Sequence, residues 1–177
     1  SDLLIPIYSV EIQDKKVALS FDATWGADQT SELLRILREN KVKCTFFLCG
    51  LWLEKYPEMV KRIAAEGHEI GNHSYTHPHL NNLSPEEIAH ELLRTHELIK
   101  ELTGQISRVF RPPFGEYNNK VIETAEACHY TTIIWDVDSL DWKDLSSGEM
   151  VTRILNKIKP GSILLFHNAG KYTPQAV

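Results

Sequence analysis

The sequence predicts an α/β protein built around a parallel sheet, and two features of the chain indicate this class. Short runs of β-branched and aromatic residues alternate with segments whose apolar residues recur at helical spacing. This alternation repeats along the chain, and repeated β/α units imply parallel strands. The length of 177 residues suits one domain, residues 1–177. A closed barrel and an open sheet both fit, although an eight-fold barrel usually takes about 250 residues.

The first half of the chain supplies three strand–helix units. Strands are expected at residues 17–21, 44–48 and 68–71. The first helix follows with apolar residues at 33, 34, 36 and 37. After a break at Gly50, Pro57 begins the next helix and Gly67 ends it. Ser84 is the expected cap of a long third helix that ends near Gly104.

The second half continues the same alternation. Strands are expected at residues 109–110, 131–135 and 162–166, with helices near 121–128 and 150–158. The three cysteines, Cys44, Cys49 and Cys128, cannot all pair within one chain, and their apolar neighbours indicate small core residues.

Composition excludes some classes of partner. The formal net charge is −5 and Lys and Arg are not clustered, so no nucleic-acid partner is expected. No apolar run approaches the roughly 20 residues of a membrane span. The first residues lack the pattern of a signal peptide, which leaves a cytosolic protein or one whose targeting segment has been removed. No feature of the sequence indicates the oligomeric state.

Polar residues suited to catalysis follow nearly every predicted strand. They are Asp22 after the first strand, His73 and His77 after the third, Arg111 after the fourth, Asp136, Asp138, Asp141 and Trp142 after the next, and His167 after the last. In parallel β/α folds, ligands bind at the carboxyl ends of the strands. These side chains are therefore expected to converge at one face.

Each of these residues also has an ordinary structural explanation. Either Asp22 or Asp28 could cap the first helix. Arg111 could be a solvated loop charge, Trp142 could belong to the core, and His167 could be a satisfied core histidine. A pair of histidines four residues apart also arises by chance. Only the joint order of these residues argues for a catalytic site.

That joint order resembles the polysaccharide deacetylase family, also called the NodB-homology domain or carbohydrate esterase family 4. Five successive motifs match, and they span residues 17–168. They are Ser20-Phe21-Asp22-Ala23, His73-Ser74-Tyr75-Thr76-His77, Arg111-Pro112-Pro113-Phe114-Gly115, Asp138-Ser139-Leu140-Asp141-Trp142 and Leu164-Leu165-Phe166-His167. The resemblance implies an irregular β/α barrel and hydrolysis of acetyl groups on a polysaccharide substrate.

The resemblance also implies roles for the residues that would do the chemistry. Asp22 would be the general base, and His73 and His77 would bind a divalent metal, zinc or cobalt. His167 would be the general acid, with its charge supported by Asp141, and Asp138 is the second choice for that supporting role.

Further residues would orient the base and bind the substrate. Arg111 would orient Asp22 and keep it ionised. A backbone N–H near Phe114 would stabilise the oxyanion, and Phe114 itself would contact substrate. Trp142 and Leu165 would shape the pocket for the acetyl methyl group and a sugar face.

The chain departs from the family at Ala23, where the family usually has a second aspartate that serves as the third metal ligand. Alanine has no donor atom, so weak metal binding is expected. Three outcomes stay open: Asp22 approaches the metal itself, the enzyme is weak or metal-independent, or the protein binds sugar without turnover.

The stretch Phe21-Asp22-Ala23-Thr24-Trp25-Gly26 resembles a bacterial subgroup of sporulation-type deacetylase-like proteins. This implies a peptidoglycan substrate and an extracellular or cell-wall location, while chitin oligomers and acetylated xylan remain open. The family's usual last helix and strand would follow Val177, so the barrel is expected to be incomplete at its carboxyl-terminal end.

Overall fold

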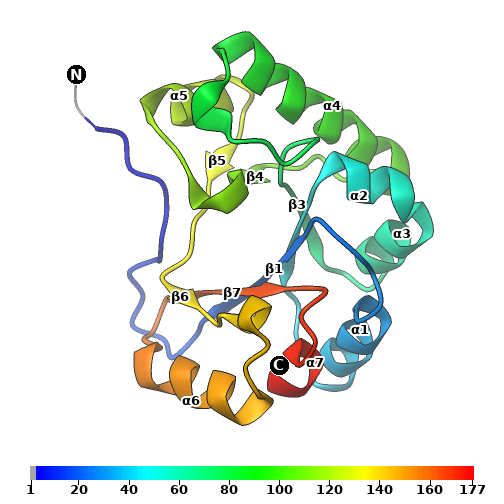
Figure 1. Ribbon diagram of the computed structural model, residues 1–177, viewed down its shortest axis with the longest axis vertical. Helices are drawn as coiled ribbons and strands as arrows, with labels where there is room; N and C mark the ends of the chain where they lie inside the picture. The colour runs from blue at the N-terminus through cyan, green and yellow to red at the C-terminus, as the bar shows by residue number, and fades with distance from the viewer. Residues whose placement is uncertain (1–2) are drawn as a thin grey trace.

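The computed structural model describes residues 3–177 and confirms the α/β class (Figure 1). One seven-stranded sheet has the order β5-β4-β3-β2-β1-β7-β6, and all its strand pairs are parallel. The strands are β1 Ala18–Ala23, β2 Thr45–Leu48, β3 Glu69–Asn72, β4 Val109–Phe110, β5 Thr131–Thr132, β6 Val137–Asp138 and β7 Ile163–His167.

Helices surround the sheet, and the amino-terminal segment runs along a side that they leave uncovered (Figure 1). The helices are α1 Thr30–Glu39, α2 Gly50–Lys55, α3 Pro57–Ala65, α4 Pro85–Thr103, α5 Asn119–Ala127, α6 Ser147–Lys157 and α7 Thr173–Ala176. Short 3-10 turns are η1 Leu80–Asn82, η2 Pro113–Gly115 and η3 Asp141–Lys143. In the part of the chain that the structure describes, none of the helices has the length and apolar character needed to cross a bilayer.

The sheet forms a distorted, incomplete β/α barrel, as the resemblance implies, with β5 and β6 as its edges. The amino-terminal segment spans the gap between β5 and the start of β7. The Ile7 N–H donates to the Thr132 carbonyl at 3.0 Å, and the Val10 N–H donates to the Gly161 carbonyl at 3.0 Å. This segment therefore joins the end of β5 to the start of β7.

Apolar side chains fill the spaces between the sheet and the helices. The main core includes Phe21, whose ring stacks on those of Phe46 and Phe166 at centroid distances of 5.0 and 5.7 Å. Burial of such rings is the main favourable term in folding. Cys44 and Cys49 are buried in this core, as expected. Cys128 is half-buried against a second cluster, which packs beneath α4 and α5.

Several strand boundaries differ from those that the sequence predicts. The strand expected at 17–21 continues to Ala23, so Asp22 and Ala23 lie inside β1. The strand expected at 131–135 ends at Thr132, and the unpredicted β6 follows it. Neither Asp22 nor Asp28 caps α1, because its N-cap is Gln29, which makes no side-chain capping bond.

Gly50 begins the unpredicted helix α2 instead of breaking the chain. A Cβ at this position would lie 2.1 Å from the Tyr75 ring, so only glycine lets the helix start this close to the segment that follows β3.

Candidate active site

A cavity of about 630 Å³ lies at the carboxyl ends of the strands. Most of the predicted site residues line it, namely Asp22, His73, His77, Phe114, Asp138, Trp142, Leu165 and His167. Two more predicted residues, Arg111 and Asp141, are fully buried behind the lining and bind lining residues directly. The register of the sheet explains part of this convergence, because Asp22 on β1 is paired with His167 on the neighbouring strand β7.

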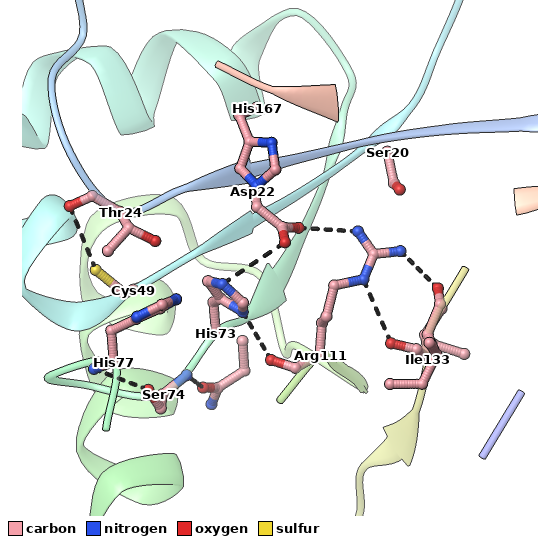
Figure 2. A network of polar contacts seen from close by, with 12 residues as sticks. Ser20, Asp22, Thr24, Cys49, His73, Ser74, His77, Arg111, Ile133 and His167 are labelled. Atoms are coloured by element: carbon pink, nitrogen blue, oxygen red, sulfur yellow. Dashed lines mark hydrogen bonds and ion pairs between the residues drawn. The ribbon is translucent and has the colours of Figure 1, made fainter. Parts of the chain in front are cut away.

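Arg111 follows β4 and binds Asp22 on β1, although strands β3 and β2 lie between β4 and β1 in the sheet. Its Nη1 donates to Asp22 Oδ1 at 2.8 Å (Figure 2). Its guanidinium lies over the Phe47 ring at 4.2 Å. Nη2 donates to the Ile134 carbonyl at 2.7 Å, which fixes the other side of the group. Burial alone would raise the pKa of Asp22, but Arg111, followed by His73 and His167, outweighs burial and holds this pKa below its ordinary value.

His73 is buried, and one of its ring nitrogens has a defined protonation state. Nδ1 lies 2.7 Å from the Arg111 carbonyl, which can only accept, so Nδ1 carries the proton (Figure 2). Burial lowers the pKa of His73 despite the opposing charge of Asp22. In the neutral ring, Nε2 therefore has a free lone pair, and it lies 3.7 Å from Asp22 Oδ2.

His77 completes the histidine pair. Its ring centroid is 4.8 Å from that of His73, and burial, reinforced by the neighbouring His73, lowers the pKa of His77 to about 4. Both rings are thus neutral near pH 7, which is the state that binds metals. The backbone of His77 has a left-handed φ of 59°, and its N–H donates to Ser74 Oγ at 3.1 Å (Figure 2).

His167 forms a pair with the buried Asp141. His167 Nδ1 lies 2.8 Å from Asp141 Oδ1, and the His167 backbone N–H donates to Asp141 Oδ2 at 2.5 Å. Thr173 on α7 also donates to Oδ2, at 2.7 Å. Burial opposes the charged form of His167, but the Asp141 hydrogen bond and the charge of Asp22 outweigh it, so the pKa of His167 is raised.

The substrate-binding candidates form part of the cavity wall. Leu165 is buried, whereas Phe114 and Trp142 are more than half exposed. The N–H groups of Gly115 and Glu116 donate to the carbonyls of Pro112 and Pro113, which leaves the Phe114 N–H as the candidate oxyanion donor.

The residues present provide only part of a metal site. His73 and His77 have the donor chemistry that zinc and cobalt prefer. Ala23 has no exposed surface and belongs to the main core, so it adds nothing to the site. Across residues 3–177, no group of three His, Cys, Asp or Glu side chains is placed to hold an ion. The pair fits a divalent metal whose remaining positions are open to water and substrate.

Asp136 does not line the cavity, contrary to the expectation that it would lie at the site with Asp138 and Asp141. Its carboxylate accepts from the Ile163 N–H at 2.7 Å and from Ser162 Oγ at 2.9 Å. These partners lie at the start of β7, whereas the cavity lies at the strand's end, so Asp136 has a structural role. Asp138 does line the cavity, and its Oδ1 accepts from the Leu140 N–H at 2.8 Å.

Glu91 and Trp25 lie in the site region, and the sequence assigns neither of them a role. Glu91 on α4 binds the loop between the two histidines, where its Oε2 accepts from the N–H groups of Tyr75 at 2.7 Å and Thr76 at 2.9 Å. Trp25, in the loop after β1, lines the cavity. No sequence pattern pairs Glu91 with a loop 15 residues away. Trp25 lies outside the five family motifs, although it belongs to the stretch that resembles the sporulation-type subgroup.

Comparison with known proteins defines the class. Residues 9–133 match the polysaccharide deacetylase family, so the chain belongs to that family, also called carbohydrate esterase family 4.

Two curated relatives come from Bacillus. A peptidoglycan-N-acetylglucosamine deacetylase of Bacillus cereus is 38% identical over 153 residues, which cover 86% of this chain and 56% of the relative. The uncharacterized protein YlxY of Bacillus subtilis is 37% identical over 162 residues, covering 92% of this chain and 51% of YlxY. The chain therefore spans little more than half the length of these relatives.

Among solved structures, a carbohydrate esterase family 4 pseudoenzyme from Bacillus anthracis is similar to this chain. The TM-score is 0.94 at 37% identity, and the match covers 97% of this chain and 61% of the pseudoenzyme. A mutant of that protein, described as having restored enzymatic activity, matches at the same TM-score of 0.94. Membership of the family thus includes both active and inactive proteins.

Proposed function

We propose that this protein binds an N-acetylated amino-sugar polymer of the bacterial cell wall in the cavity and removes its acetyl groups. The observation that carries this proposal is the presence of two charge-supported pairs, Asp22 with Arg111 and His167 with Asp141, facing one cavity. A binding protein has no need of a poised base and a poised acid together. The similarity to a peptidoglycan-N-acetylglucosamine deacetylase supports peptidoglycan as the polymer.

The first half of the reaction uses Asp22. Its carboxylate accepts a proton from water as the water oxygen bonds to the acetyl carbon, and Arg111 keeps it oriented and ionised. The Phe114 N–H is the proposed donor to the oxygen that becomes negative. A zinc or cobalt ion held by His73 and His77 would supply polarisation of the acetyl carbonyl and acidification of the attacking water.

The second half uses His167. When the carbon–nitrogen bond breaks, the sugar amine leaves with a proton from His167, and acetate remains. Asp141 orients the imidazole and supports its charged form. Leu165 and Trp142 are the proposed apolar walls for the acetyl methyl group.

A second candidate function is glycan binding without turnover. The buried Ala23 favours it, because only two histidines are left to hold a metal, and so does the similarity to a pseudoenzyme. Hydrolysis of an O-acetyl ester, as on acetylated xylan, would also use Asp22 and His167. The acetate-release experiment below includes this substrate.

We further propose that residues 1–177 act as one domain, at the cell wall outside the cytoplasm. Relatives that are peptidoglycan deacetylases support the location.

Two measurements on one set of ligands test the proposal. Acetate release is followed from N-acetylglucosamine oligomers, peptidoglycan and acetylated xylan, with added zinc, with cobalt and with a chelator. Binding of the same oligomers is measured by calorimetry on Asp22→Asn, which keeps the residue's size but removes the proton acceptor. We expect acetate from the amino sugars with metal present. Binding without acetate from any substrate would establish the second candidate instead.

A further inference from the structure

Trp25 is an exposed tryptophan at the rim of the cavity. It follows β1 by two residues, lines the cavity together with Asp22 and His77, and is 77% exposed. Packing into the core does not explain this position, since most of the indole surface remains in water. Exposed aromatic side chains in a cleft are typical of ligand contacts.

The backbone on both sides of Trp25 is held in place. The Thr24 carbonyl faces Cys49 Sγ at 3.9 Å (Figure 2). The Gly26 carbonyl accepts from Trp52 Nε1 at 3.3 Å and from Asn168 Nδ2 at 3.1 Å. Three buried side chains thus fix the loop while the indole projects from it. Because this backbone is already ordered, it loses little conformational entropy when a ligand binds.

The ring stands beside the candidate reaction centre. Its centroid is 6.4 Å from that of His77 at an interplanar angle of 60°. His77 also neighbours Phe114, at 4.7 Å, and Phe114 stacks on His79 at 4.2 Å and 9°. Two exposed aromatic rings, Trp25 and Phe114, therefore border the histidine pair.

We infer that Trp25 stacks against a second sugar ring of the polymer, adjacent to the ring that carries the reacting acetyl group. This inference rests on the glycan binding in the proposed function and adds a subsite to it. A pyranose ring presents a face of C–H groups, which packs against the flat face of an indole. Leu165 and Trp142 are assigned to the acetyl methyl group and a face of the sugar that carries it, so Trp25 at the rim is placed for a neighbouring sugar. Trp25 would accordingly determine a preference for oligomers over single sugars.

Calorimetry on the full chain tests this inference, with Asp22→Asn as the common background to prevent turnover. The ligands are N-acetylglucosamine and its tetramer. Trp25→Ala should weaken tetramer binding roughly tenfold and leave monosaccharide binding within about twofold. Trp25→Phe, which keeps an aromatic face, should recover most of the tetramer affinity. Leu155→Ala, which removes an exposed apolar side chain of α6 that is not part of the cavity lining, is the control and should change neither value.

Unchanged tetramer affinity in Trp25→Ala, or an equal loss for tetramer and monosaccharide, would overturn the subsite. A parent that binds no oligomer would overturn the subsite and the proposed glycan function together. Normal oligomer binding with the expected Trp25 effect, but no acetate release from the Asp22-containing protein, would overturn hydrolysis alone.

Discussion

The pKa values of Asp22 and His167 are shifted in opposite directions, although the two residues occupy paired positions on neighbouring strands. Arg111 overcomes the effect of burial and lowers the pKa of Asp22, while Asp141 overcomes it and raises the pKa of His167. Near neutral pH one group can accept a proton while the other still has one to give. This separation of pKa values is what general acid–base hydrolysis requires.

Replacing His167 by Ala should reduce the hydrolysis rate by different amounts for substrates with different leaving groups. An amine must be protonated to leave, whereas phenolate departs without a proton. His167→Ala should therefore slow release from an acetamide roughly a hundredfold or more and slow phenyl acetate hydrolysis much less. Zinc affinity should stay nearly the same, since His167 is not a proposed ligand. Equal losses on both substrates, or loss of the metal, would show that His167 is not the acid.

Asp141→Asn tests the charge support through the pH profile of acetate release. A raised pKa keeps His167 protonated at pH values above its ordinary pKa of about 6.5. Activity should thus fall as pH rises through the raised pKa. Without the Asp141 charge that pKa drops, so the alkaline limb should move to lower pH. A limb that stays in place would mean that another group controls it.

At the level of elements, the loop between the two histidines depends on helix α4. Ser74 and His77 both have left-handed backbone conformations, with φ of 66° and 59°. Glu91 holds this loop through two backbone N–H groups and through Thr76 Oγ1 at 2.5 Å. The geometry of the histidine pair therefore rests on one carboxylate of the neighbouring helix.

Glu91→Ala should weaken zinc binding by roughly tenfold or more, because supporting contacts of this kind typically contribute tenfold to a hundredfold to metal affinity. Glu91→Gln keeps an acceptor oxygen and should retain most of the affinity. Glu101→Ala, an exposed position on the same helix, is the control. Calorimetric zinc titration measures all three. Equal affinities in Glu91→Ala and Glu101→Ala would remove the loop contact from the metal site.

Ala23→Asp tests what the missing ligand does. Ala23 is fully buried at the end of β1, so an introduced, unpaired carboxylate should lower the unfolding free energy by roughly 3–5 kcal/mol without metal. Zinc should restore this stability and bind more tightly than in the parent. Urea denaturation with and without zinc measures both effects. A destabilised variant with unchanged zinc affinity would mean that the new side chain does not reach the histidines.

For the molecule as a whole, the sequence predicted the parallel sheet and the end of it that carries the cavity. Those features follow from local periodicity and from motifs that each sit on a single strand end. The short strands β5 and β6 were not separated, because the β-branched run at residues 131–134 extends past the two residues that pair in β5. Asp136 was misplaced for the same reason: its position relative to β7 depends on where the chain crosses from β5 to β6. Glu91 and Trp25 depend on tertiary neighbours that no local pattern contains.

Acetate release from N-acetylglucosamine tetramer, followed as zinc is titrated into the metal-free protein, tests the central claim most directly. Because two histidines without a third protein ligand should bind zinc weakly, we expect release to rise with zinc and to reach half its maximum at the calorimetric dissociation constant. His77→Ala should shift that midpoint to much higher zinc. Release that is independent of zinc, or absent at every zinc concentration while the tetramer still binds, would contradict metal-assisted deacetylation in this cavity.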